Sequence, residues 1–219
     1  MSYVSFVISV IKDFKTKHSM ENVQLEKQAK LSEHLASPSE AALGHLSELN
    51  GSRLSPHFTL GEMTKTSTGM MNIPSRVSIE NLKRVCGWLE ALRCRYNQRY
   101  VSPSSDHPAL TGTPPDSGGE KDTEEPIIIS SGYRSPEVNR KVGGSATSNH
   151  LTGCAVDIRV AGIEQALRYA VILMDYADET RRDYDELLIE RNRSGRYWVH
   201  FAVRPPKSQN RRKTAMLSV

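Results

Sequence analysis

The spacing of hydrophobic residues changes along the chain and predicts where its helices and strands lie. Between residues 78 and 97, apolar side chains recur every three or four positions, which is the period of one buried helix face. Residues 162–177 repeat this spacing and predict a second amphipathic helix. Short runs rich in β-branched residues predict strands instead. We expect these strands in residues 126–131, 155–160, 187–190 and 197–203.

Residues that favour turns and helix starts separate these segments. Ser194 and Gly195 lie between the last two strands and predict a β-hairpin. Pro136 suits the first position of a short helix that Gly143 and Gly144 would end. Because helices and strands mix without a regular βαβ repeat, the predicted fold class is α+β.

Three stretches lie outside this pattern. Residues 1–55 carry apolar positions at helical intervals and predict an N-terminal extension, either a partner-binding helix or a loosely ordered segment. Residues 102–125 are rich in Pro, Ser, Gly, Asp and Thr and predict a flexible insertion, because they cannot bury enough apolar surface. Residues 206–219 predict a basic tail. One folded domain is therefore expected in residues 56–205.

Composition changes this picture little. The net charge of +4 is mild and much of it lies in the predicted tail, so no nucleic-acid partner is expected. Three cysteines without a CxxC pair argue against a disulfide framework. The apolar first eleven residues lack a basic segment and a cleavage site, and they are too short to span a bilayer. We therefore predict neither an export signal nor a transmembrane segment.

Candidate chemistry lies where a loop enters the strand of residues 155–160. His150 and Asp157 are seven residues apart, and strand alternation turns Asp157 away from the predicted core. His200 lies in the last strand. Two imidazoles and one carboxylate are the set that holds catalytic zinc with a fourth position open. The spacing alone, however, favours structural histidines over a metal site.

A resemblance strengthens the metal interpretation. Several motifs occur in order: SSGYRSP in residues 130–136, Asn139, VGG in 142–144, S-x-H-x-x-G-x-A-x-D in 148–157, and WVH in 198–200. Together they resemble the D-alanyl-D-alanine carboxypeptidase family of zinc peptidases, most of all its short single-domain bacterial and phage cell-wall members. The resemblance covers about residues 56–203.

This resemblance implies a fold, a metal and a reaction. The fold would be the one shared with the Hedgehog signalling domain, a small antiparallel sheet with flanking helices. One Zn²⁺ would be held by His150, Asp157 and His200, and activated water would hydrolyse peptide bonds of peptidoglycan stem peptides. Arg134 would bind a substrate carboxylate through two hydrogen bonds. Ser148 would donate a hydrogen bond to substrate or cap the loop.

The general base departs from the family pattern. Many members place an acidic residue three positions before the last histidine, where this chain has Tyr197. Related short domains carry a glutamate at the end of the preceding strand. We therefore predict Glu190 as the catalytic base, with Glu186 and Asp185 as the alternatives.

The pairing register of the hairpin decides whether Glu190 can act. Opposite Trp198, Glu190 would share a sheet face with His200; opposite Val199, it would face away. We predict the first register, because the second would bury a carboxylate in the core at a cost of roughly several kcal/mol.

Three functions agree with these features. The leading one is a zinc D,D-carboxypeptidase or endopeptidase acting on cell-wall peptides. A phage or mobile-element lysin of the same chemistry would explain the missing export signal. A non-catalytic zinc-containing binding module is the third, and Tyr197 in the usual acid position keeps it open. As an enzyme, the protein would be synthesised in a bacterial or phage-infected cytoplasm and act at the cell wall.

Overall fold

The computed structural model describes residues 51–101 and 124–219. The predicted extension in residues 1–55 and the predicted insertion in 102–125 therefore fall almost wholly outside the described residues. Within the described part, no helix combines the length and the hydrophobicity needed to cross a membrane. All three cysteines are free, in agreement with the odd count.

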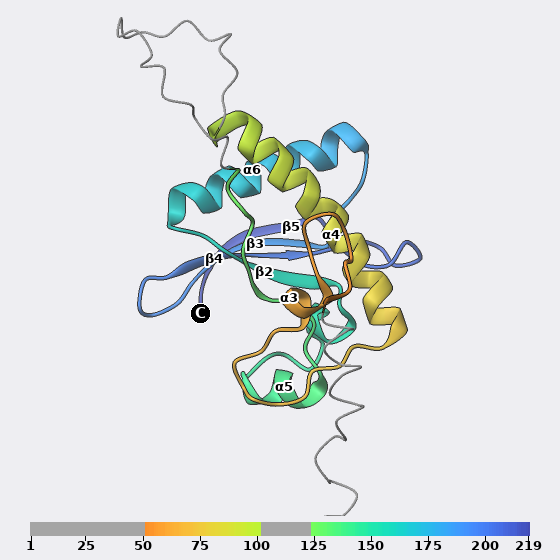
Figure 1. The fold of residues 1–219 in the computed structure, drawn as a ribbon. Coiled ribbons are helices and arrows are strands. Elements are labelled where there is room, and N and C mark those ends of the chain that lie inside the picture. The colour runs from red at the N-terminus through yellow and green to blue at the C-terminus, as the bar shows by residue number, and fades with distance from the viewer. Residues whose placement is uncertain (1–50, 102–123) are drawn as a thin grey trace, which may run out of the picture. The chain divides into compact units, whose positions relative to one another are not determined.

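A five-stranded sheet organises the described residues (Figure 1). Its order is β1-β2-β4-β3-β5, and every neighbouring pair is antiparallel except β3 and β5. The strands are β1 (Ile129–Ser131), β2 (Ala155–Arg159), β3 (Glu186–Arg191), β4 (Tyr197–Ala202) and β5 (Lys213–Ser218). The α+β class and the mostly antiparallel sheet are thus confirmed.

Two long helices cover one face of this sheet. They are α4 (Arg76–Tyr96) and α6 (Ile163–Thr180), which pack against each other and against the central strands (Figure 1). Both follow the predicted amphipathic spacing. The core between these layers contains Leu82, Val85, Leu89, Val156, Ile158, Ile172, Val199 and Phe201, each fully buried.

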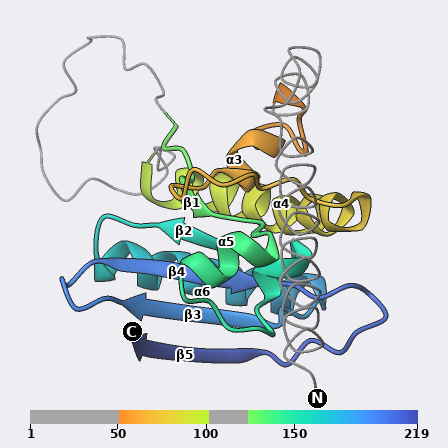
Figure 2. The same cartoon turned by 90° about the horizontal axis from the view of Figure 1, so that it is seen from below.

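Short helices lie on the other side of the sheet. Figure 2 shows α5 (Pro136–Lys141) in front of the strands, with α6 behind them. The remaining short elements are α3 (Leu60–Thr64) and the 3₁₀ turn η2 (Asn149–Thr152), while the π-helical turn η1 (Asn97–Val101) directly continues α4. Pro136 occupies the predicted first position of α5, after a cap by Ser135. The turn η2, which contacts α5 and β2, carries His150 to the open face of the sheet.

The β3–β4 hairpin has the predicted register. Glu190 pairs with Trp198, and Leu188 pairs with His200. On the other side of β4, His200 pairs with Asp157 of β2. Residues that are directly opposite share a sheet face, so Glu190, His200 and Asp157 all lie on the face away from the core.

The predicted basic tail needs a correction. Residues 213–218 form β5, which runs parallel to β3 from the pair Glu186–Lys213 to the pair Arg191–Ser218. Without β5, β3 would be an edge strand with unpaired backbone groups. The ordered fold therefore extends beyond residue 205. In β5, Ala215 and Leu217 are half-buried and Met216 is exposed, so the alternation of buried and exposed residues is weak. Because basic residues directly precede the strand, the sequence pattern predicted a solvated tail there.

Candidate metal centre

His150 is placed by a short turn whose ends are fixed locally. Ser148 caps η2, and its hydroxyl accepts a hydrogen bond from the backbone N–H of His150 at 3.3 Å. Gly153 ends the turn with φ of 71°, and a Cβ there would lie 2.5 Å from the carbonyl oxygen of Ser78. A residue with a side chain would therefore be both strained and obstructed at this position.

The ring of His150 is oriented by a backbone carbonyl. Its Nδ1 lies 2.6 Å from the carbonyl oxygen of Gly132. A carbonyl only accepts, so Nδ1 donates and Nε2 carries the lone pair of the neutral ring. The buried Nε2 is thereby prepared as a ligand atom.

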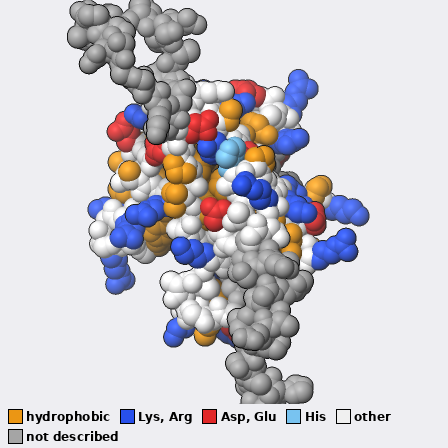
Figure 3. Space-filling model, in the orientation of Figure 1, with side chains coloured by type: hydrophobic (Ala, Val, Ile, Leu, Met, Phe, Trp, Pro, Cys, Tyr) orange, Lys and Arg blue, Asp and Glu red, His pale blue; other side chains and the backbone are white. Residues whose placement is uncertain are grey.

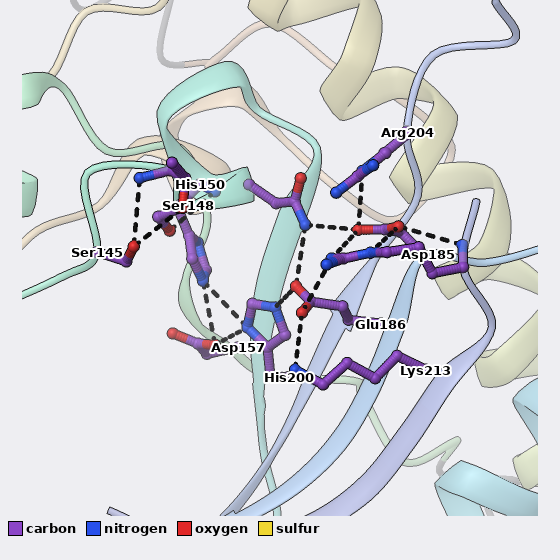
Figure 4. A network of polar contacts seen from close by, with 12 residues as sticks. Ser145, Ser148, His150, Asp157, Asp185, Glu186, His200, Arg204 and Lys213 are labelled. Atoms are coloured by element: carbon purple, nitrogen blue, oxygen red, sulfur yellow. Dashed lines mark hydrogen bonds and ion pairs between the residues drawn. The ribbon is translucent and has the colours of Figure 1, made fainter. Parts of the chain in front are cut away.

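Asp157 and His200 complete a buried group of three ligands (Figure 4). His150 Nε2 lies 3.3 Å from Asp157 Oδ1 and 3.3 Å from His200 Nδ1. His200 Nδ1 lies 2.9 Å from Asp157 Oδ1. The structure therefore brings together the three residues that the sequence predicts as metal ligands.

The geometry of this group fits a small divalent metal. Zinc bonds to nitrogen and oxygen are about 2.0–2.1 Å long, so two ligands of a tetrahedral zinc lie about 3.3 Å apart. The three separations of 2.9, 3.3 and 3.3 Å agree with this value. Three protein ligands also leave a fourth position for water or substrate, as in catalytic sites.

Arg134 contacts the metal centre directly. Its Nη2 donates to Asp157 Oδ2 at 2.5 Å, and its Nε donates to Ser131 Oγ at 2.8 Å. Burial alone would raise the pKa of Asp157, but its interactions with the two imidazoles lower it well below its usual range. Asp157 is therefore a carboxylate with Oδ1 directed at the metal position. Substrate binding by Arg134 stays a prediction.

Glu186 contacts the outer side of the His200 ring. Glu186 Oε2 lies 3.6 Å from His200 Nε2 and accepts a hydrogen bond from Asn149 at 3.0 Å. The interaction with His200, together with charge from Arg211, lowers the pKa of Glu186 to about 2. A carboxylate held in this way orients a metal-ligating histidine. It is also a weak base, so it suits positioning better than proton transfer.

The pKa of Glu190 is shifted in the opposite direction from that of Glu186. The side chain is half-buried on the face that carries His200 and Asp157. Burial raises the pKa of Glu190, and the charge of Asp157 adds to this, although His200 acts in the opposite direction. A raised carboxyl pKa brings the group closer to the range in which general bases operate. Of the three predicted candidates, Glu190 thus has the most suitable environment.

The sequence around the first two ligands matches a known family of peptidases. The model of the peptidase M15 family matches residues 120–180. These residues belong to a peptidase M15 domain. The match confirms the resemblance to D-alanyl-D-alanine carboxypeptidase-like enzymes. A search of curated proteins finds no match.

The M15 domain obtains its third ligand from beyond the matched residues. His150 and Asp157 lie within residues 120–180, whereas His200 follows on β4. The pairing of β2 with β4 places His200 directly opposite Asp157. The domain is therefore a metallopeptidase domain with a complete His-Asp-His metal-binding triad.

Sequence reasoning did not predict the polar network that supports this triad. Asp185 has no exposed surface, and its carboxylate contacts Arg204 Nε at 3.0 Å and Arg211 Nη2 at 2.7 Å. It also accepts a hydrogen bond from Asn149 at 2.9 Å (Figure 4). Asp185 thus joins the turn that carries His150 to β3 and to the C-terminal segment. Its partners are distant in sequence, so no local pattern reveals the network.

We expect the Asp185→Asn variant to be less stable by about 1–3 kcal/mol at pH 7. Burial alone would raise the pKa of Asp185, but its hydrogen bonds to Arg211 and Asn149 lower it. A lowered pKa means that the stabilisation is present above the unfolded value of about 3.9 and is lost as pH falls through the folded value. Urea unfolding should show a difference that shrinks below about pH 4. A difference that stays constant between pH 7 and pH 3 would contradict this role.

Proposed function

We propose that the M15 domain is a zinc peptidase that hydrolyses peptide bonds of peptidoglycan stem peptides, as a D,D-carboxypeptidase or endopeptidase. The observation that carries the proposal is the position of Glu190. It shares the open sheet face with a convergent His-Asp-His triad, and its pKa is raised. The cell-wall substrate rests on the motif resemblance and on the family match.

The residues of the site divide the work of peptide hydrolysis. A zinc ion at the triad would make water more acidic and polarise the carbonyl that is attacked. Glu190 accepts the proton of the attacking water at its carboxylate and passes it to the leaving amine. Arg134 keeps Asp157 Oδ2 occupied so that Oδ1 faces the metal position.

Two further residues belong to this proposal. Ser148 accepts a hydrogen bond from the His150 N–H, which leaves its own hydroxyl hydrogen to donate to a substrate carbonyl. The side chain of Arg134 is 17% exposed, so part of its surface is accessible beside the triad. Both residues would contact the peptide close to the bond that is cleaved.

On one face of the molecule, the charge distribution favours a peptide substrate over nucleic acid. On the face shown in Figure 3, Lys and Arg side chains are scattered and interrupted by acidic and hydrophobic ones. Nucleic-acid-binding proteins instead gather these residues into a patch or stripe. We place the action of the enzyme at the bacterial cell wall, where its substrate occurs.

Digestion of whole peptidoglycan tests the proposal. The zinc-loaded full chain should release D-alanine or cut stem peptides, as read by mass spectrometry of the muropeptides. A chelator should abolish this activity and added zinc should restore it. Unchanged muropeptides in the presence of one bound zinc would overturn the proposal and support the non-catalytic binding module, which Tyr197 in the usual acid position keeps open.

A further inference from the structure

A cleft of about 640 Å³ lies where β2 ends and β4 begins, and none of the three triad residues lines it. Its wall includes Ser130 of β1, Arg159 of β2 and Trp198 of β4, and it continues to the start of α6. Arg159 pairs with Trp198 in the sheet, two positions along from the pair formed by Asp157 and His200. Both pairs share a face, so the backbone of Arg159 and Trp198 lies about 6.6 Å along the strands from that of Asp157 and His200, at 3.3 Å per strand residue.

The cleft carries two exposed arginines. They are Arg159 and Arg196, and neither guanidinium has an acidic partner among residues 51–101 and 124–219. The cleft also contains Glu125, whose carboxylate accepts a hydrogen bond from Gln165 at 2.7 Å. The two arginines therefore outnumber the described acidic residue of the cleft, Glu125, whose carboxylate already has a hydrogen-bond partner. The ligand chemistry that suits this lining is a carboxylate.

The position of Arg134 strengthens this assignment. The sequence motifs predict that Arg134 binds the substrate carboxylate, yet its guanidinium donates to Asp157 and Ser131. A substrate carboxylate at Arg134 would compete with a buried ligand of the metal. Arg159 and Arg196 make no such bonds within the described part of the chain, so they can offer their full hydrogen-bonding capacity.

We propose that this cleft binds a carboxylate of the peptide substrate through Arg159 and Arg196. The inference rests on the proposed peptidase function. An extended peptide advances about 3.3 Å per residue, so the carboxylate would belong to a residue one to two positions from the cleaved bond. Trp198 lines the same cleft on the sheet face of the triad and would pack against the peptide. The carboxylate is either the C-terminus of the peptide or an acidic side chain.

Equilibrium binding to the zinc-loaded Glu190→Gln variant tests the proposal without turnover. Calorimetry would compare three stem-like tetrapeptides: one with a free C-terminus and no acidic side chain, its C-terminal amide, and that amide carrying one glutamate. We expect at least one carboxylate-bearing peptide to bind about tenfold or more tightly than the neutral amide. The peptide with the advantage identifies the source of the carboxylate. Equal binding of all three, or no binding by any, overturns the proposal.

Substitution of the arginines supplies the second readout. Arg159→Gln combined with Arg196→Gln should remove the preference for a carboxylate. Arg182→Gln, which removes an exposed arginine from a pocket between α4 and the end of α6, should preserve it. A preference that survives the double substitution would overturn the assignment.

The two hypotheses fail in different ways. If wild-type protein cleaves no peptide while the arginine-dependent preference persists, the hydrolase proposal fails and the cleft assignment stands. If it cleaves peptides without any such preference, the cleft assignment fails and the hydrolase stands.

Discussion

Glu190→Gln is expected to lower kcat on a stem peptide by about 10²- to 10⁴-fold while one zinc ion per chain stays bound. Glutamine preserves the shape of the side chain but cannot accept the proton of the attacking water. Because Glu190 is not one of the three clustered ligands, the metal content should not change. Steady-state kinetics together with metal analysis of the purified variant would measure both quantities.

Glu186→Gln is the matched control for this experiment. Glu186 contacts His200, so its loss should lower metal affinity by about 10- to 100-fold. Excess zinc should therefore restore much of the activity of Glu186→Gln and none of the activity of Glu190→Gln. If Glu190→Gln keeps most of the wild-type kcat, Glu190 is not the general base. Activity of Glu186→Gln that stays low in saturating zinc would assign proton transfer to Glu186 instead.

His150→Ala should abolish peptidase activity and reduce zinc affinity by more than about 100-fold. Loss of a residue that only hydrogen-bonds to a metal ligand costs up to about 100-fold in affinity, and loss of the ligand itself should cost more. The substitution removes one of three ligand atoms from a buried cluster whose remaining members are Asp157 and His200. Competition for zinc with a chromophoric chelator would measure the affinity. Unfolding measurements on the same sample would show whether the fold is retained.

His57→Ala is the control for removal of an imidazole. The His57 side chain is 46% exposed and interacts with Glu90. Its removal should change neither zinc affinity nor kcat. Zinc binding by folded His150→Ala with the affinity of the wild type would show that the triad is not the metal site.

The periodicity of hydrophobic residues in the sequence was sufficient to predict the helices and strands that bury one face. The helices α4 and α6, the strand β2 and the β3–β4 hairpin all lie where apolar spacing predicts them. The same reasoning predicted the register that places Glu190 beside the triad, because the opposite register would bury a carboxylate in the core. Strand β5 escaped prediction, since it is an outer strand whose alternation is weak and is preceded by basic residues.

For the candidate site, too, one part could be predicted from the sequence and another part could not. The identity of the three metal ligands follows from residue types and motif order along the chain. Their separations of 2.9–3.3 Å depend on the pairing of β2 with β4 and on the Gly132 carbonyl that turns the His150 ring. The motifs also predict that Arg134 binds the substrate, and only the fold shows that its guanidinium donates to Asp157.

By itself, therefore, the sequence determined the fold class, the helices and central strands, and the residues able to bind the metal. These properties follow from local periodicity and from chemical type. Only the tertiary structure decided which carboxyl group has a lowered pKa and which has a raised pKa. It alone also decided which arginines line the cleft. Such properties depend on burial and on charged partners that are distant along the chain, as Asp185 and Arg211 illustrate.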